Sequence, residues 1–333
     1  MANRLSKAII PLAELEGLLN TAYSSNELST ALDRHFILVD ITNWNKAGKT
    51  SATEQWQPNC PIIAVAEDDS DLPPMVDLVA GTDAELDMLT RAITDNPVAS
   101  TMLVHLLRSN ERSTTENALM AESLSYSCLQ NGASFKNWLK QKKSGTKLLA
   151  DKSPPLLLER ENNILNIIFN RENKRNAYSA LLRDAFYEAL VLVEEDKTIE
   201  TALISGLGEC FSAGGDLDEF GSSTDSALAH IVRMTRNNGR LIDRLKSRIV
   251  FNLHGACIGA GIELPAFSNR VTARRDSFFQ LPEVAMGLIP GAGGTVSIPR
   301  RIGRLRTAFM AISNQKIYAE RALTWGLIDE ING

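Results

Sequence analysis

The feature that most constrains the fold of this chain is a run of short apolar strands that alternate with helices between residues 156 and 253. Two apolar segments, 156–160 and 164–169, flank Glu161-Asn162-Asn163 and predict a β-hairpin. Beyond it, the pattern predicts a helix over 178–194, a buried strand over 201–205, a long helix over 226–245 and a strand over 249–253. Strands that alternate with helices indicate a layered α/β domain with at least partly parallel pairing.

Glycine-rich turns follow two of these strands. Residues 206–217 come after the strand at 201, and residues 254–261 come after the strand at 249 and open a helix. Neither turn fits GxGxxG or GxxxxGK[ST], so neither predicts a nucleotide loop. Glycine permits close backbone approach and a helix start leaves N–H groups free, so the two turns together predict an oxyanion hole. The alternative is two tight strand-to-helix connections without a ligand.

Two glutamates lie twenty residues apart just beyond these turns. Glu263 ends the segment that begins at His254, and Glu283 follows Pro282 ahead of the glycine-rich run 287–294. One acid delivered onto a helix and a second delivered nearby predict a two-carboxylate active site. The alternative is that one of the two only caps a helix or forms a salt bridge.

A change of composition divides the chain near residues 141–155, where basic and polar residues precede Pro154-Pro155. Because prolines cannot continue a helix, this stretch predicts a linker between residues 1–140 and 156–333. The N-terminal part predicts strands over 36–41, 61–66 and 75–80 and helices over 83–93, 98–108 and 113–130. The simplest interpretation is a small helical domain that packs on the rest, with an apolar stripe formed by Leu119, Ala121, Leu124, Cys128 and Leu129.

Composition excludes several classes of partner. The net charge is −5 and no long basic run occurs, so we expect neither nucleic acid nor a membrane as a partner. The four cysteines show no CxxC spacing, which indicates a reducing compartment and no metal site. No signal peptide and no run of eighteen apolar residues is evident, so we expect a cytoplasmic protein.

Four segments together resemble the crotonase (enoyl-CoA hydratase/isomerase) superfamily, in its order and at its spacings. They are Asn170–Ala177, Phe211–Leu217, His254–Glu263, and Pro282–Gly294. The resemblance covers roughly residues 155–330. It implies an α/β fold with a crotonase-like core of the ββα spiral type, and residues 156–333 as an acyl-CoA-binding catalytic core.

The resemblance also implies roles for individual residues. The backbone N–H groups of Gly215 and Ala260 match those that bind the thioester oxygen of an acyl-CoA, where an enolate develops. The family usually has glycine at the position of Ala260. The positions matched to coenzyme A binding are Lys174, Arg175, Ala177, Ala213, Gly214 and Asp216. Asp216 is also expected to cap its turn. His254 is expected to form a structural hydrogen bond, and Cys257 is not expected to act as a nucleophile.

Both glutamates occupy the positions that hydratases of the family use. Glu263 would activate a water that attacks the β-carbon, and Glu283 would deliver the α-proton. This implies an enoyl-CoA hydratase, a lyase, with acyl-CoA as its substrate and no cofactor. Alternatives are isomerisation or thioester hydrolysis on the same scaffold, or a non-catalytic CoA-binding subunit. The resemblance further implies a homotrimer or hexamer.

The chain departs from the family at both ends of the match. Family members continue beyond the segment that matches 319–330 with helices that cover the site, whereas this sequence stops at Gly333. Residues 116–124 and 132–140 are similar to the family's final helix and its terminal phenylalanine-rich segment. We therefore expect a circular-permutation-like arrangement in which residues 82–140 replace the C-terminal helical cover. This arrangement requires Phe135 and Trp138 to contact the crotonase-like core.

Overall fold

The C-terminal half of the chain is built on a six-stranded sheet. The structure, a computed structural model, describes residues 9–21, 27–44, 57–66, 69, 71–142 and 153–332. The order of this sheet is β13-β10-β8-β7-β6-β5, and every neighbouring pair is parallel except the β5–β6 hairpin. Its strands are β5 (Leu156–Glu161), β6 (Ile164–Phe169), β7 (Thr201–Gly206), β8 (Ile249–Leu253), β10 (Arg270–Arg274) and β13 (Glu330–Asn332).

A three-stranded sheet and the helices complete this half. The small sheet has the order β12-β11-β9, with β9 (Ala256–Ile258), β11 (Phe278–Gln280) and β12 (Ile317–Tyr318). The helices are α8 (Ala180–Glu195), α9 (Ser226–Thr235), α10 (Asn238–Leu245), α11 (Ala260–Glu263), α12 (Gly294–Ser313) and α13 (Ala319–Trp325). Short 3₁₀ turns are η3 (Glu172–Lys174), η4 (Leu217–Glu219), η5 (Pro265–Phe267) and η6 (Val284–Met286). The predicted hairpin and the strand–helix alternation are confirmed.

One predicted helix is wrong in its length. Residues 226–245 form two helices, because the side chain of Asn237 accepts a hydrogen bond from Arg240 N (2.9 Å) and caps a new helix, α10. Asparagine is a preferred N-cap residue because its side-chain oxygen satisfies a free backbone N–H. This break lets α9 lie along the helices of the N-terminal region while α10 packs against α8.

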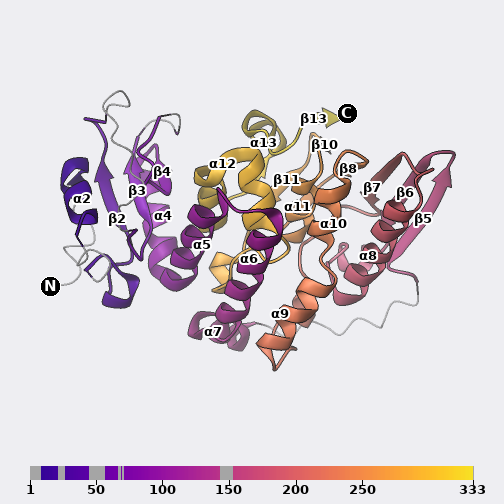
Figure 1. Ribbon diagram of the computed structural model, residues 1–333, viewed down its shortest axis with the longest axis horizontal. Helices are drawn as coiled ribbons and strands as arrows, with labels where there is room; N and C mark the ends of the chain where they lie inside the picture. The colour runs from indigo at the N-terminus through magenta and orange to yellow at the C-terminus, as the bar shows by residue number, and fades with distance from the viewer. Residues whose placement is uncertain are drawn as a thin grey trace.

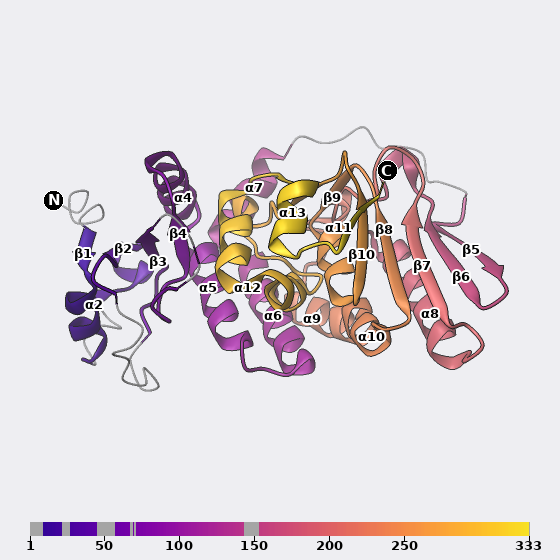
Figure 2. The same ribbon diagram turned by 90° about the horizontal axis from the view of Figure 1, so that it is seen from above.

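The N-terminal region begins with a four-stranded parallel sheet. Its strands are β1 (Ile9–Pro11), β2 (Ile37–Asp40), β3 (Ile62–Val65) and β4 (Leu78–Ala80), and α2 (Leu12–Leu19) and η1 (Thr30–Leu32) accompany them. Strand β4 is shorter than predicted because the backbone turns at residues 73–76, where Val76 N donates to Pro73 O (3.0 Å). This sheet forms one end of the molecule, and the β5–β6 hairpin lies at the other end (Figures 1 and 2).

Four helices follow, and they lie between the two ends. They are α4 (Asp83–Asp95), α5 (Pro97–Asn110), α6 (Thr115–Gln130) and α7 (Ala133–Gln141). The N-cap of α4 is Thr82, whose hydroxyl accepts from Glu85 N (3.2 Å). In both views α5 and α6 lie beside α12, so segments from the two halves of the chain are neighbours (Figures 1 and 2).

Apolar packing runs without a break from these helices into the C-terminal half. Phe135 of α7 is buried, stacks on Trp138 (5.9 Å between ring centroids) and lies 6.4 Å from the ring of Phe220. Trp138 lies 6.0 Å from Phe220, so both aromatic residues contact the core as the expected replacement requires. Most of the predicted linker, residues 143–152, lies outside the described residues, and the division into domains stays a prediction. In the described part of the chain, no helix is both long and apolar enough to cross a membrane.

Candidate active site

The two glycine-rich turns lie side by side at the carboxyl ends of β7 and β8. Parallel strands bring their following loops to the same edge of a sheet. Ile258 N donates to Ser212 O (3.0 Å) and Ser212 N donates to Ala256 O (3.2 Å), which joins the turns directly. A Cβ on Gly261 would lie 2.8 Å from Ser212 O, so the close approach depends on glycine there.

These turns present two free backbone donors to a cavity of about 230 Å³. We call it the reaction cavity; residues of α6, α8, α9, α10 and α11 and of the loops after β7 and β11 line it. Gly215 and Ala260 both line it, and neither backbone N–H has an acceptor among the described residues. Buried N–H groups are almost always paired, so two unpaired ones on one cavity wall can bind an oxygen that gains negative charge.

Glu263, the last residue of α11, is almost completely buried at 2% exposure. Its Oε2 accepts hydrogen bonds from Ala292 N (2.7 Å) and Gly294 N (2.9 Å), at the start of α12. The free N–H groups of a helix start stabilise a negative charge. Glu263 is therefore held as an acceptor through one oxygen, and its other oxygen is directed to the reaction cavity.

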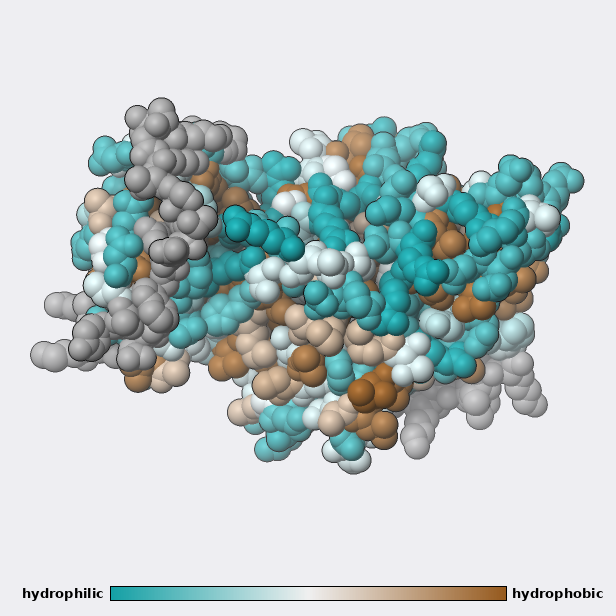
Figure 3. Space-filling model, viewed as in Figure 1, coloured by the Kyte–Doolittle hydropathy of each residue, from teal (hydrophilic) through white to brown (hydrophobic). Residues whose placement is uncertain are grey.

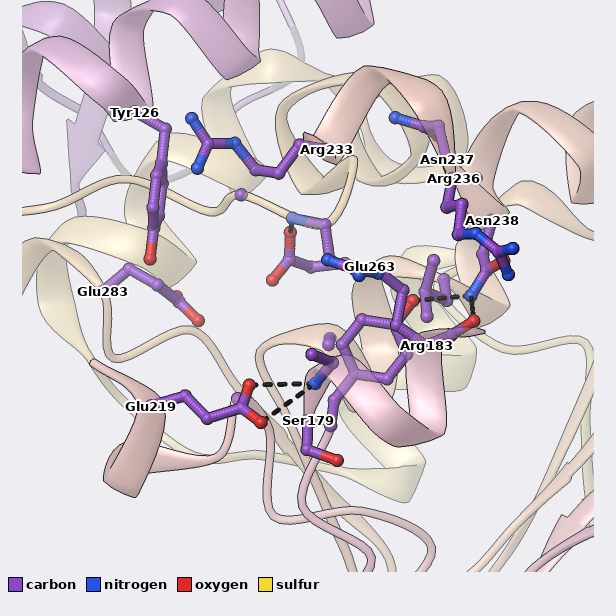
Figure 4. A pocket seen from close by; sticks show the side chains of 18 of the residues that line it. Tyr126, Ser179, Arg183, Glu219, Arg233, Arg236, Asn237, Asn238, Glu263 and Glu283 are labelled. Carbon is purple, nitrogen blue, oxygen red and sulfur yellow. Dashed lines mark hydrogen bonds between the residues drawn. The ribbon is translucent and has the colours of Figure 1, made fainter. Parts of the chain in front are cut away.

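Glu283 approaches the same space from the loop between β11 and η6, and it is 9% exposed. Its Oε2 is buried without a hydrogen-bond partner in the described residues. A Cβ on Gly259 would lie 2.4 Å from Glu283 Oε1 and 3.7 Å from Glu263 Oε1, so the two oxygens face one small volume. Figure 4 shows both carboxylates extending into the cavity. Gly259 has φ 50°, and only glycine fits there without displacing Glu283.

Burial changes the protonation of this pair. Burial and the negative charge of Glu122 on α6 together raise the pKa of Glu283 to about 8, although a hydrogen bond from its own backbone N–H acts in the opposite direction. Burial also raises the pKa of Glu263, and the charges of Glu283 and Glu122 add to the effect. Donors at Ala292 and Gly294 act in the opposite direction on Glu263. Two carboxyls that face one volume cannot both ionise easily, so the pair keeps a proton. Backbone N–H groups stabilise a negative charge on Glu263 Oε2, whereas Glu283 Oε2 has no such donor in the described residues.

Three residues of the N-terminal helices and α9 also reach this site, and the sequence analysis missed them. Glu122 is buried, and Tyr126, one turn later on α6, lines the reaction cavity with its hydroxyl end toward Glu283 (Figure 4). No acceptor for the Tyr126 hydroxyl occurs among the described residues. Arg233 of α9 lies over the ring of Tyr126, 4.9 Å from its centroid, and burial lowers the pKa of its guanidinium.

The apolar stripe expected on α6 explains why they were missed. Leu124 and Cys128 were placed on the buried face but are exposed, whereas Glu122, Ser123 and Ser127 are buried. Polar residues at positions 122, 123, 126 and 127 recur at helical spacing and mark the true inner face. A buried polar face of this kind indicates contact with a functional site.

A third acid on the wall of the cavity already has partners. Glu219 accepts two hydrogen bonds from Ala180 N (3.1 and 2.9 Å) and caps α8, as the dashed lines in Figure 4 mark. Burial raises the pKa of this carboxyl. Its role is therefore to hold α8, which distinguishes it from Glu263 and Glu283.

The residues expected to bind coenzyme A lie beside the reaction cavity and not on its wall. They are Lys174, Arg175, Ala177, Ala213, Gly214 and Asp216. The structure brings them together, since Ala213 N donates to Arg175 O (2.9 Å) and Gly214 O accepts from Tyr178 N (2.7 Å). Lys174 forms an ion pair with Asp218. Their role in binding coenzyme A stays a prediction.

Three secondary expectations have structural counterparts. Asp216 accepts from Asp218 N (3.2 Å) and caps η4, and it also pairs with Arg171 (2.9 Å). His254 Nε2 lies 3.0 Å from Gly208 O, a structural hydrogen bond. Cys257 is buried, and burial raises the pKa of its thiol, so the nucleophilic thiolate is disfavoured. Within the described ranges, no cluster of His, Cys, Asp or Glu could hold a metal ion.

Comparison with known proteins gives one consistent family. Residues 159–333 match a protein-family model described as enoyl-CoA hydratase/isomerase. The chain is 31% identical over 179 residues to 2,3-dehydroadipyl-CoA hydratase of Escherichia coli, a match that covers 53% of this chain and 68% of that protein. It is 30% identical over 176 residues to 1,2-epoxyphenylacetyl-CoA isomerase of the same organism, covering 51% and 67%. The structure of an enoyl-CoA hydratase from Thermoplasma volcanium aligns with a TM-score of 0.51 at 30% identity, over 55% of this chain and 74% of that one.

Proposed function

This chain belongs to the enoyl-CoA hydratase/isomerase family, the crotonase superfamily, and from that premise we propose that it hydrates the 2,3-double bond of an enoyl-CoA, or catalyses the reverse dehydration. The observation that carries the proposal is the joint presence of two buried carboxyls facing one volume and two free backbone donors in the same cavity. Isomerases and hydratases both occur among its relatives, and the pair of acids favours the reaction that must place a water.

In the proposed hydration, the two backbone donors and the two glutamates each have a separate role. The thioester oxygen accepts hydrogen bonds from Gly215 N and Ala260 N, which stabilise the enolate as it forms. Glu263 takes a proton from water, and the water oxygen bonds to the β-carbon as the β-carbon's π-bond to the α-carbon breaks. Glu283, which burial keeps protonated near neutral pH, gives its proton to the α-carbon. The proton gained by Glu263 then returns to Glu283, which restores the pair.

Substrate binding in this proposal extends outside the cavity. Lys174 and Arg175 contact the phosphates of coenzyme A, and the backbone near Ala177, Ala213 and Gly214 contacts the adenine, with Asp216 holding that turn. The substrate is an acyl-CoA and no cofactor takes part. The cytoplasmic location expected from the sequence stays a prediction.

Isomerisation is the second candidate. A protonated Glu283 and a charged Glu263 on either side of one volume can also move a proton between two carbons, and one relative is named an isomerase. Solvent isotope labelling separates the two reactions, because hydration adds an oxygen from water to the product and isomerisation does not. Product analysis by mass spectrometry in H₂¹⁸O reports the difference directly.

The first experiment measures turnover of crotonyl-CoA by the loss of the conjugated thioester absorbance. We expect the wild type to be active and Glu263→Gln and Glu283→Gln each to lose about 10²–10⁴ in kcat, as for lost general acid–base catalysis. Glu161→Gln on β5, an exposed residue far along the sheet, is the matched control and should keep wild-type activity. Activity that survives both cavity substitutions would overturn the mechanism. Wild-type protein that binds coenzyme A but turns nothing over would favour a binding subunit.

We further propose that the chain assembles into a homotrimer or hexamer. Helix α9 has no buried residue and exposes Leu228 (59%) and Ile231 (57%), and α6, which packs against α9, exposes Met120 and Leu124. Apolar colour gathers on this face of the molecule (Figure 3). Contiguous exposed apolar residues mark interaction surfaces. Sedimentation equilibrium should give a multiple of the 36.5 kDa chain mass, and Ile231→Glu should reduce it.

A further inference from the structure

A third buried carboxylate, Glu122 of α6, contacts the same segment that holds Glu263. It is 2% exposed and accepts three hydrogen bonds. Gly293 N donates to Oε1 (2.7 Å), and Thr295 N (2.9 Å) and Thr295 Oγ1 (2.7 Å) both donate to Oε2. A carboxylate suits this position because both of its oxygens act only as acceptors.

Successive backbone N–H groups at the start of α12 alternate between two carboxylates. Those of residues 292 and 294 bind Glu263, and those of residues 293 and 295 bind Glu122. The segment packs closely on its neighbours and admits no side chain here, because a Cβ on Gly294 would lie 2.6 Å from Glu263 Cγ and a Cβ on Gly293 would lie 2.4 Å from the Phe267 ring. The two acids therefore clamp one segment from opposite sides.

We infer that Glu122 is a positioning residue for the reaction: it fixes the 292–295 segment, whose other N–H groups orient the carboxylate of Glu263 toward the reaction cavity. This role gives the N-terminal helices a task beyond covering the site. Its effect on kcat rests on the proposed function. Glu122 does not line the cavity, so it acts through Glu263 and touches no substrate.

The charges around Glu122 fit this task. Burial raises the pKa of Glu122 to about 7, whereas the donors of Thr295 and Gly293 and the positive charge of Arg233 lower it. Arg233 is in turn fixed on α6, where its Nε donates to Ser123 Oγ (3.0 Å) and its NH2 to Ser123 O (3.0 Å). The carboxylate of Glu122 is thus held by hydrogen bonds from Gly293 and Thr295, and the charge of Arg233 on α9 favours its ionised form.

Two substitutions of Glu122 disturb its hydrogen bonds to the 292–295 segment in different ways. Glu122→Gln keeps the size but turns an amide NH₂ toward a backbone N–H, and Glu122→Asp keeps the charge but is one methylene too short. For both we expect kcat to fall about 10- to 100-fold with KM unchanged, since a small misplacement of a catalytic group has effects of this order. Amide hydrogen exchange at residues 292 and 294 should accelerate in both variants, and this readout needs no activity.

Two controls exclude a general loss of stability. Glu116→Gln on the exposed face of α6 should leave kcat and exchange unchanged. Leu15→Ala in the N-terminal sheet region should lower the melting temperature without changing kcat or exchange at 292 and 294.

Retention of kcat within about twofold by Glu122→Asp, or unchanged exchange at 292 and 294 in both variants, would overturn the inference. If the wild type turns over no enoyl-CoA, the proposed function fails and exchange alone decides the inference. If Glu122→Gln does not fold, Glu122→Asp decides it.

Discussion

The two parts of the N-terminal region differ in how they meet the catalytic half. One face of the parallel sheet described between residues 9 and 80 has an apolar cluster of its own around Leu15, Leu19 and Ile62, and its other face joins the main core through Ile63 and Leu78. The helices of residues 83–141 share their buried residues with the catalytic core and supply Glu122 and Tyr126 to the site. Both parts precede the core in the sequence, yet of their described residues only those of the helices line the reaction cavity. The helices reach the site because they pack on α9 and α12, whereas the sheet lies at the far end of the molecule (Figure 1).

The largest effect that would test this contrast comes from Phe135. Its ring packs on Phe220, and Phe220 in turn contacts Gly215, where a Cβ would lie 2.8 Å from the ring. Phe135→Ala should lower the free energy of unfolding by about 3–5 kcal/mol and also reduce kcat, whereas Leu15→Ala should cost about 2–5 kcal/mol and leave kcat unchanged. Urea unfolding and steady-state kinetics measure both. Equal kinetic effects of the two substitutions would erase the distinction.

The joint between the sheet region and the rest should matter for stability alone. Asp77 is buried, accepts from Arg108 Nε (2.8 Å) and Ile62 N (2.9 Å), and lies 3.4 Å from Arg304 NH1 of α12. Asp77→Asn leaves buried arginines without their acid and should reduce the free energy of unfolding by about 3–5 kcal/mol. We expect kcat per folded molecule to be unchanged. A change in kcat would show that the sheet region also acts on the site.

The pH dependence of stability should report the buried acids of the site. The pKa of Glu283 rises from 4.5 to about 8 on folding, so the folded protein binds more protons than the unfolded chain between these values. The free energy of unfolding should therefore fall as pH rises through this window. Urea unfolding at several pH values should show a smaller slope for Glu283→Gln than for the wild type. If the free energy of unfolding has the same pH dependence in the wild type and in Glu283→Gln, the raised pKa of Glu283 is contradicted.

The smallest expected effect concerns the hydroxyl of Tyr126. Its ring lies against Gly291, where a Cβ would be 2.5 Å from Cδ2, so phenylalanine keeps the packing. Tyr126→Phe should raise the activation free energy by about 0.5–1.5 kcal/mol, the net value of the one hydrogen bond that the free hydroxyl can donate to a group bound in the reaction cavity. We expect no loss of stability. Steady-state kinetics and a melting curve check both. If the kinetics are unchanged, the hydroxyl of Tyr126 has no part in the reaction, and α6 contributes only Glu122 and apolar packing.

The sequence by itself determined the local elements of the catalytic half and its two acids. The hairpin, the alternation of strands and helices, and the glycine turns follow from periodicity and from backbone freedom, which are properties of neighbouring residues. Parallel pairing then required the turns after β7 and β8 to meet. The prediction of one long helix over 226–245 was wrong because one side chain, Asn237, caps a new helix within an otherwise continuous helical pattern.

Only the tertiary structure decided which face of α6 is buried and what it reaches. Nothing in the sequence around Glu122 indicates burial, because a carboxylate is rarely buried without partners. Its partners are the N–H groups of Gly293 and Thr295, more than 170 residues further along the chain. No local pattern encodes a contact over that separation. The contact exists because the helices of residues 83–141 pack on α12, and packing of distant segments depends on the complementarity of whole surfaces.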